Sequence, residues 1–102
     1  MEKIDLFEIE EKNLEIITNK FFSVRYLYLD AGRGMPVRKE QAMATIQVIE
    51  GRITFVYGKE EKACMMQQHA ILEFDGRLTY SIIAHENSKI LITIVPVNGK
   101  KS

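Results

Sequence analysis

Apolar residues recur at every second position along much of this chain, which is the period of a half-buried β-strand. The two clearest segments are 42–50 and 52–57, and Gly51 between them supplies a turn. A strand–turn–strand unit of this kind buries one face of each strand. The residues expected to face the interior are Ala44, Ile46, Val48, Ile53, Phe55 and Tyr57.

Further short apolar segments, bounded by turn residues, predict the rest of the fold. Segment 21–30 is apolar on both faces except at Ser23 and Arg25, so we expect it to be covered on both sides. The other predicted strands are 62–66, 69–74, 78–83 and 89–95. Seven or more short strands, with turn signals roughly every 8–12 residues, predict an all-β antiparallel sandwich or barrel.

The length of 102 residues predicts a single domain, 1–102. Residues 1–20 form a lead-in of short strands or irregular structure, although part of their pattern is compatible with a short helix. The barrel is expected over 21–96. A tail is expected over 97–102, beyond the strand-ending Pro96.

Charge and composition exclude several classes of partner. Fourteen basic residues balance fourteen acidic ones, so nothing favours nucleic acid or an anionic membrane. No apolar run approaches the roughly 18 residues of a membrane span. The acidic N-terminus does not resemble a signal peptide, and Cys64 is the sole cysteine. We therefore expect a cytoplasmic protein.

The glycines at the two ends of segment 32–51 carry a resemblance to a known family. Gly32 and Gly51 have the spacing of the first motif of small single-domain cupins, and Pro36 and the phrase ATIQVIEGRITF (44–55) are similar in texture. In the family this motif reads Gly, five residues, His-x-His, three or four residues, Glu, six residues and Gly. The resemblance covers 32–93 and implies a double-stranded β-helix, the jelly-roll barrel of cupins.

The resemblance also implies where a metal would bind, and those positions have changed. Arg38 and Glu40 stand in place of the two motif histidines, Ala44 replaces the motif glutamate, and Tyr80 falls at the third histidine. Divalent transition metals need several converging N, O or S donors. Arginine is a fixed cation, alanine has no donor, and neutral tyrosine is a poor ligand. We therefore predict a barrel without the family metal and without another cofactor.

Without a metal, the barrel offers two alternatives. In the first, an apolar pocket binds a small amphipathic ligand, for example one with a carboxylate for Arg38. The predicted ligand-binding residues are Arg38, Glu40, Tyr57, Tyr80 and His69. In the second, Arg38 and Glu40 pair with each other or face solvent, and side chains fill the barrel.

Three functions follow from these alternatives. The leading hypothesis is a metal-free binding or sensing module without catalysis of its own. The second is an enzyme: a metal-independent isomerase or epimerase that pairs Glu40 with Tyr80 or His69, or a rewired metal site that combines Glu40 with His69 or His85. The third is an interaction protein with a filled barrel.

The remaining candidate residues are interpreted structurally. Cys64 is expected to be a small core residue, and His85 a solvated turn residue. Several apolar residues are predicted to face outward and to need a cover, which the N-terminal strands or a second subunit would provide. They are Met43, Ile49, Val56, Ile71 and Ile83. We therefore predict a homodimer.

Overall fold

The computed structural model describes residues 2–40 and 42–96, and the tail predicted over 97–102 lies outside them. A single 3-10 turn, η1 (Leu6–Glu8), comes before the first strand. The strands are β1 (Asn13–Thr18), β2 (Ser23–Leu29), β3 (Gly34–Arg38), β4 (Ala42–Glu50), β5 (Arg52–Tyr57), β6 (Lys62–Gln67), β7 (Ile71–Asp75), β8 (Tyr80–Ala84) and β9 (Ser88–Pro96). No helix within 2–40 and 42–96 has the length and apolar character to span a membrane.

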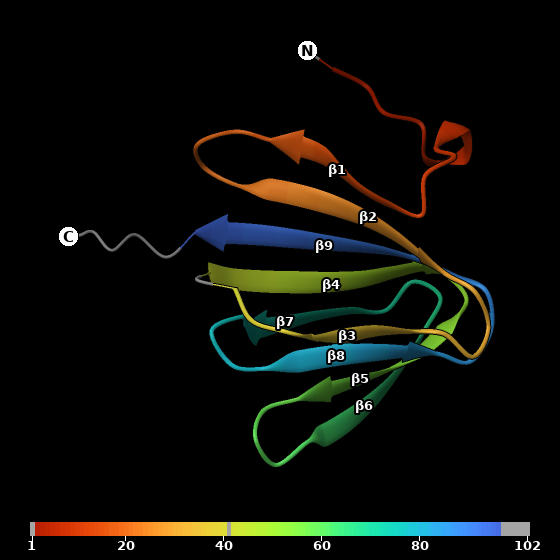
Figure 1. The fold of residues 1–102 in the computed structure, drawn as a ribbon. Coiled ribbons are helices and arrows are strands. Elements are labelled where there is room, and N and C mark those ends of the chain that lie inside the picture. Colours follow the sequence, from red (N-terminus) through yellow and green to blue (C-terminus); the bar gives the residue numbers. More distant parts are fainter. Residues whose placement is uncertain (1, 41, 97–102) are drawn as a thin grey trace.

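The strands form two antiparallel sheets that pack face to face (Figure 1). The five-stranded sheet has the order β1-β2-β9-β4-β7, and the four-stranded sheet has the order β3-β8-β5-β6. Chain neighbours such as β4 and β5 therefore lie in opposite sheets, and β9 returns between β2 and β4. This arrangement confirms the predicted all-β jelly roll.

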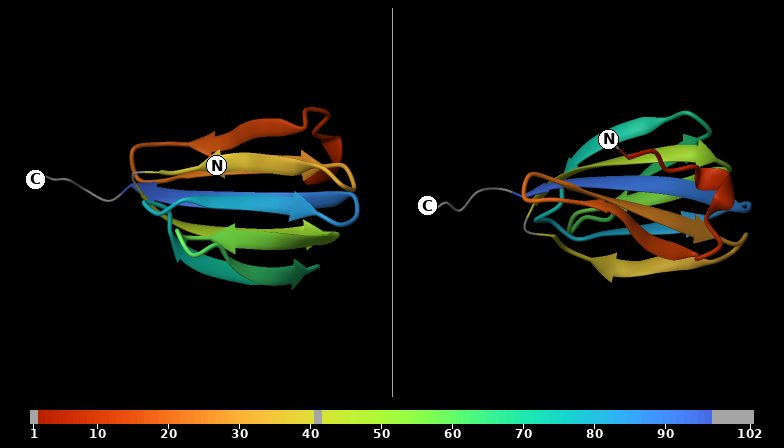
Figure 2. Two further views of the ribbon diagram at one scale, coloured as in Figure 1. Left: turned by 60° about the horizontal axis from the view of Figure 1, so that its bottom comes forward. Right: turned by 90° about the horizontal axis from the view of Figure 1, so that it is seen from above.

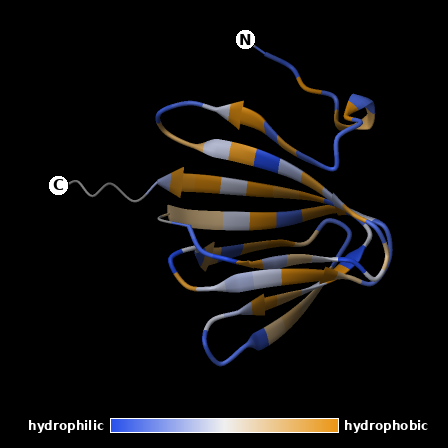
Figure 3. Cartoon of the chain, viewed as in Figure 1, coloured by the Kyte–Doolittle hydropathy of each residue, from blue (hydrophilic) through white to orange (hydrophobic). Residues whose placement is uncertain are grey.

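Alternation along the strands places the apolar core between the sheets. The interior residues predicted from segments 42–50 and 52–57 all belong to or pack against one core cluster, so this prediction is confirmed. Ile46, Val48 and Ile53 have no exposed surface, and Ile82 and Ile90 meet them from other strands. Hydrophobic and hydrophilic residues alternate along the ribbons in Figure 3, as this two-sided packing requires.

Gly51 makes the turn between β4 and β5 for two reasons. Its φ of +96° is a left-handed conformation that favours glycine. An added Cβ would also lie 2.3 Å from the hydroxyl of Ser88. That fully buried hydroxyl donates to the carbonyl of Glu86 at 2.7 Å and accepts from the amide of Arg52 at 3.2 Å. The turn therefore ties the start of β5 to the start of β9.

β2 is buried on both faces, as its sequence predicted. Leu27 and Leu29 enter the core, whereas Tyr26 lies on the outer face and is still only 2% exposed. The lead-in segment covers that outer face, since Ile9 lines a shallow hollow together with Tyr26. Figures 1 and 2 show η1 beside one end of β1 and β2.

β3 is a strand where the sequence suggested only a bend and an extended approach. It lies at the edge of its sheet, so Pro36 does not remove a ladder hydrogen bond from a central strand. Its register against β8 shifts between Met35 and Arg38, which marks a bulge. Gly34 allows close contact there, because an added Cβ would lie 3.0 Å from the carbonyl oxygen of Ile82.

Candidate functional site

Three of the predicted site residues meet at one end of the molecule. Arg38 ends β3, Glu40 precedes β4, and Tyr80 begins β8. Arg38 Nε lies 3.0 Å from Glu40 Oε2, and the Tyr80 hydroxyl donates to the same oxygen at 3.1 Å. The bulge in β3 makes this possible, since it brings Arg38 opposite Tyr80. One carboxylate oxygen thus accepts from both a guanidinium and a phenol.

The electrostatics of this cluster keep Tyr80 protonated. Burial, then the negative charge of Glu40 and its hydrogen bond, raise the pKa of Tyr80 well above the ordinary value. The positive charges of Arg38 and Arg25 oppose this rise only partly. At neutral pH Tyr80 is therefore a hydrogen-bond donor. Its phenol is not matched to proton abstraction, because an effective base has a pKa near the working pH.

Aromatic side chains fill the interior beside Glu40. The Phe55 and Phe74 ring centroids are 4.8 Å apart, and Tyr80 lies 4.8 Å from Phe74 and 5.8 Å from Phe55. Tyr57 adds a fourth ring, 5.9 Å from Phe55 and 6.0 Å from Phe74. These four rings, here called the aromatic plug, occupy the space in which the first alternative placed a ligand.

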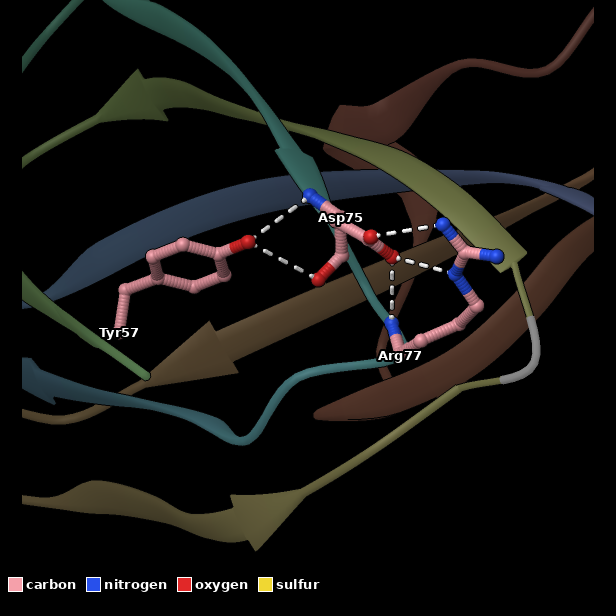
Figure 4. Close-up of polar contacts among 3 residues, drawn as sticks. All are labelled: Tyr57, Asp75 and Arg77. Atoms are coloured by element: carbon pink, nitrogen blue, oxygen red, sulfur yellow. Dashed lines mark hydrogen bonds and ion pairs between the residues drawn. The ribbon is translucent and has the colours of Figure 1, made fainter. Parts of the chain in front are cut away.

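Tyr57 uses its hydroxyl within the fold (Figure 4). The hydroxyl donates to the carbonyl of Asp75 and accepts from its amide, both at 3.2 Å. The Asp75 carboxylate accepts hydrogen bonds from Arg77 Nε and Nη2, each at 2.9 Å. Hydrogen bonds from Arg77 lower the pKa of Asp75 to about 2. Tyr57 therefore fixes the end of β7 against the end of β5.

The residues predicted at the cupin ligand positions do not fit a divalent metal. Ala44 is buried and carries no donor atom, while Glu40 Oε2 is already shared between Arg38 and Tyr80. A cation there would have to displace the Arg38 guanidinium. Within the described residues, 2–40 and 42–96, no group of three or more His, Cys, Asp or Glu side chains is placed to hold a metal ion.

The two histidines lie away from this cluster. The structure places His69 in the turn between β6 and β7, so its prediction as the start of a strand is wrong. Its φ of +76° is a turn conformation, and its amide donates to the carbonyl of Val48, near the opposite end of β4 from Glu40. His85 is exposed, and its Nε2 lies 2.6 Å from the hydroxyl of Thr54.

Cys64 corrects another prediction, because it is exposed and not part of the core. It pairs with Phe55 and so shares the inward side of the sheet. However, β6 is the edge strand, and the side chain therefore lies at an open margin. Alternation gives the direction of a side chain but does not tell whether another layer covers it.

Arg25 is a neighbour of the site that sequence reasoning missed. Its charge acts on the pKa of Tyr80, and its guanidinium donates to Asn13 Oδ1 at 2.6 Å. Glu15 Oε2 lies 3.7 Å from the same guanidinium. The sequence did indicate that Arg25 is unusual, since it is the one charged residue within an apolar strand.

Solved cupin structures share this fold. An RmlC-like cupin protein from Desulfovibrio desulfuricans matches with a TM-score of 0.83 and 22% identity, over 95% of this chain and 99% of that one. The Cnp3 cupin domain of Schizosaccharomyces pombe gives 0.82 at 14% identity, over 93% and 69%. A salicylate 1,2-dioxygenase from Pseudaminobacter salicylatoxidans gives 0.69 at 16% identity, over 74% and 21%.

These matches establish the fold of RmlC-like cupins, and identities this low establish the fold alone. No protein-family model matches the chain, and no curated protein matches it by sequence. Function therefore has to be argued from the residues of this chain.

Proposed function

We propose that this cupin-fold chain is a homodimeric interaction module that uses its barrel as a structural core and has no metal-dependent activity. The aromatic plug is the observation that carries the proposal. Four rings with centroids 4.8 to 6.0 Å apart occupy the position of a ligand pocket. A site so filled offers a ligand little surface to contact.

The polar groups of the predicted pocket also favour this function over small-molecule binding. Arg38 and the Tyr80 hydroxyl are both engaged with Glu40, and the Tyr57 hydroxyl is bonded to the backbone of Asp75. A ligand would have to replace these bonds, and breaking buried polar networks is costly. His69, the fifth predicted ligand residue, lies near the far end of β4.

The raised pKa of Tyr80 weighs against the enzyme alternative. An acid–base pair needs one member able to take up a proton near neutral pH. In the Glu40–Tyr80 pair the phenol cannot be the base, because its pKa is raised well above the ordinary value. The base would have to be the Glu40 carboxylate, whose Oε2 already accepts hydrogen bonds from Arg38 and Tyr80. His69 lies in the turn between β6 and β7, where its amide donates to the carbonyl of Val48 and its Nε2 lies 3.2 Å from Gln68 Nε2, near the other end of β4 from Glu40.

Two measurements on the wild-type chain test the proposal. Light scattering over a range of concentrations should give the mass of a dimer. Metal analysis after purification without chelator should find no stoichiometric Mn, Fe, Ni or Zn, and adding these ions should leave the melting temperature unchanged. A monomer at all concentrations, or one bound metal per chain, would reject it.

A further inference from the structure

The outer face of the four-stranded sheet is largely apolar and uncovered in the described residues, apart from His85, whose Nε2 lies 2.6 Å from the Thr54 hydroxyl. Its two central rows carry no charged side chain. From β3 to β6, the first row is Gly34, Ile83, Thr54 and Met65, and the second is Val37, Ser81, Val56 and Ala63. Ile83 is 47% exposed, Met65 63% and Val37 68%. We call this surface the neutral face.

Large and small side chains alternate on the neutral face in a regular way. Three of the four strands contribute one larger and one smaller residue to the two rows. These pairs are Val37 with Gly34 on β3, Ile83 with Ser81 on β8, and Met65 with Ala63 on β6, whereas Val56 and Thr54 on β5 are similar in size. A hollow of about 250 Å³ lies beside Ser81 and is also lined by Val37 and Val56, with Lys59 and Glu61 at its outer end.

This pattern is complementary to itself. Consider a twofold axis that lies in the plane of the interface, perpendicular to the strands and midway between the two rows. Rotation about this axis places each strand over the same strand of the other copy, and the two run in opposite directions. Every larger residue then stands over a smaller one: Ile83 over Ser81 of the other copy, and Met65 over Ala63. An isologous contact requires this reciprocity, in which residue i meets j and j meets i. The two sheets would pack aligned, about 10 Å apart.

The charges around the neutral face also fit a second copy. At one end, Arg52 pairs with Glu86 at 3.6 Å, and at the other, Lys62 pairs with Glu60 at 3.8 Å. Both ends are therefore close to neutral, and the axis above brings them together without like-charge repulsion. A strongly charged partner would find no complement here.

We propose that the neutral face is the dimer interface and that Ile83 of each copy packs over Ser81 of the other. This inference rests on the proposed function, because it names the surface of the same homodimer. The partner it commits to is a second copy of this chain. Ile83 is the central contact, since it lies on β8 inside the sheet, between Gly34 of β3 and Thr54 of β5.

The first experiment compares two exposed isoleucines on different outer faces. Ile83→Lys introduces a charge into the neutral face, while the control Ile71→Lys does so on β7 of the other sheet, where Ile71 is 63% exposed. In light scattering with dilution, we expect Ile83→Lys to weaken dimerisation at least tenfold and Ile71→Lys to leave it unchanged. Circular dichroism checks that both variants are folded.

The second experiment tests the register and does not depend on one variant alone. Ser81→Lys and Ile83→Asp should each dissociate as single variants. Mixed at equal concentration they should form a heterodimer, because the carboxylate introduced into one chain then faces the ammonium introduced into the other. Mixing Ser81→Lys with Ile71→Asp, which lacks the matching contact, should not restore it.

The outcomes separate this inference from the proposed function. A wild-type dimer that survives Ile83→Lys but is lost with Ile71→Lys keeps the homodimer and overturns the neutral face as its interface. Suppose that Ile83→Lys abolishes the dimer but that mixing Ser81→Lys with Ile83→Asp does not restore it. That result would overturn the register of Ile83 over Ser81. A wild-type monomer overturns both the inference and the homodimer.

Discussion

The outer faces of the two sheets carry similar apolar residues but differ in what covers them. On the five-stranded sheet, Tyr26 is 2% exposed because the lead-in segment lies over it. On the four-stranded sheet, Ile83 and Met65 remain open to solvent in the described chain. Tyr26 is thus covered within the chain, whereas Ile83 and Met65 are open in the described residues, as is Ile71 at the edge of the five-stranded sheet. A cover supplied by another molecule depends on concentration, whereas one within the chain does not.

The outer face of the five-stranded sheet also has backbone contacts with the lead-in segment. The amide of Tyr28 donates to the carbonyl of Lys12 at 2.8 Å, which holds the lead-in segment against β2. Ile4 and Leu6 line a second hollow with Ile49. Ile4, Leu6 and Ile9 are each partly buried in this region. Outward apolar residues therefore do not all indicate an interface, and the distinction between the faces can be tested.

The largest expected effect is the loss of the covered aromatic side chain. Tyr26→Ala should lower the free energy of unfolding by about 3 kcal/mol, as for other buried aromatics cut to alanine. Ile83→Ala, measured at a dilution where only monomer is present, should cost under about 1 kcal/mol. Urea unfolding measures both. Equal losses at the two positions would contradict the difference between the faces.

A smaller effect is expected from weakening the cover itself. Leu6→Ser combined with Ile9→Ser should cost about 2 kcal/mol, since both side chains are partly buried against the sheet. The matched control is Phe7→Ser, because Phe7 lies in the same segment but is 84% exposed. The double variant should also associate non-specifically as the covered face opens. If the control destabilises as much as the double variant, the segment does not act as a cover.

The smallest effect concerns alkaline pH. Burial, together with the negative charges of Tyr28 and Glu50, raises the pKa of Tyr26 above its ordinary value of 10.0. The folded chain then holds this proton where the unfolded chain has lost it, so stability falls as the pH rises above about 10. Absorbance titration of phenolate formation in wild type and Tyr26→Phe should show it. The Leu6→Ser, Ile9→Ser variant should bring the pKa of Tyr26 back toward its ordinary value; an unchanged titration would argue against burial as the cause.

Much of the fold was readable from the sequence because strand alternation is local. The bounds of β4 and β5 agree with segments 42–50 and 52–57, and the two-sided burial of β2 was predicted from its composition. The site was readable in part. Arg38, Glu40 and Tyr80 were identified from the cupin spacing, but their shared hydrogen bonds depend on a bulge in β3 that no pattern indicates.

The errors share a physical cause. Cys64 has the inward direction of a core residue, but the sheet order leaves β6 at an edge. His69 reads as the start of an apolar segment, but it adopts the left-handed conformation of the preceding turn. In both cases the outcome depends on which strands become neighbours and where the chain reverses.

By itself the sequence determined most of the strands and the faces they bury, and from the cupin resemblance it predicted Arg38, Ala44 and Tyr80 where the family has metal ligands. These follow from side-chain chemistry and from the two-residue period of a strand, both of which act along the chain. Only the tertiary structure decided that four aromatic rings pack together in the interior, and that Tyr26 on one outer face is covered while Ile83 on the other is open. Those properties depend on contacts between distant segments, as when Phe55 meets Phe74 and Ile9 approaches Tyr26.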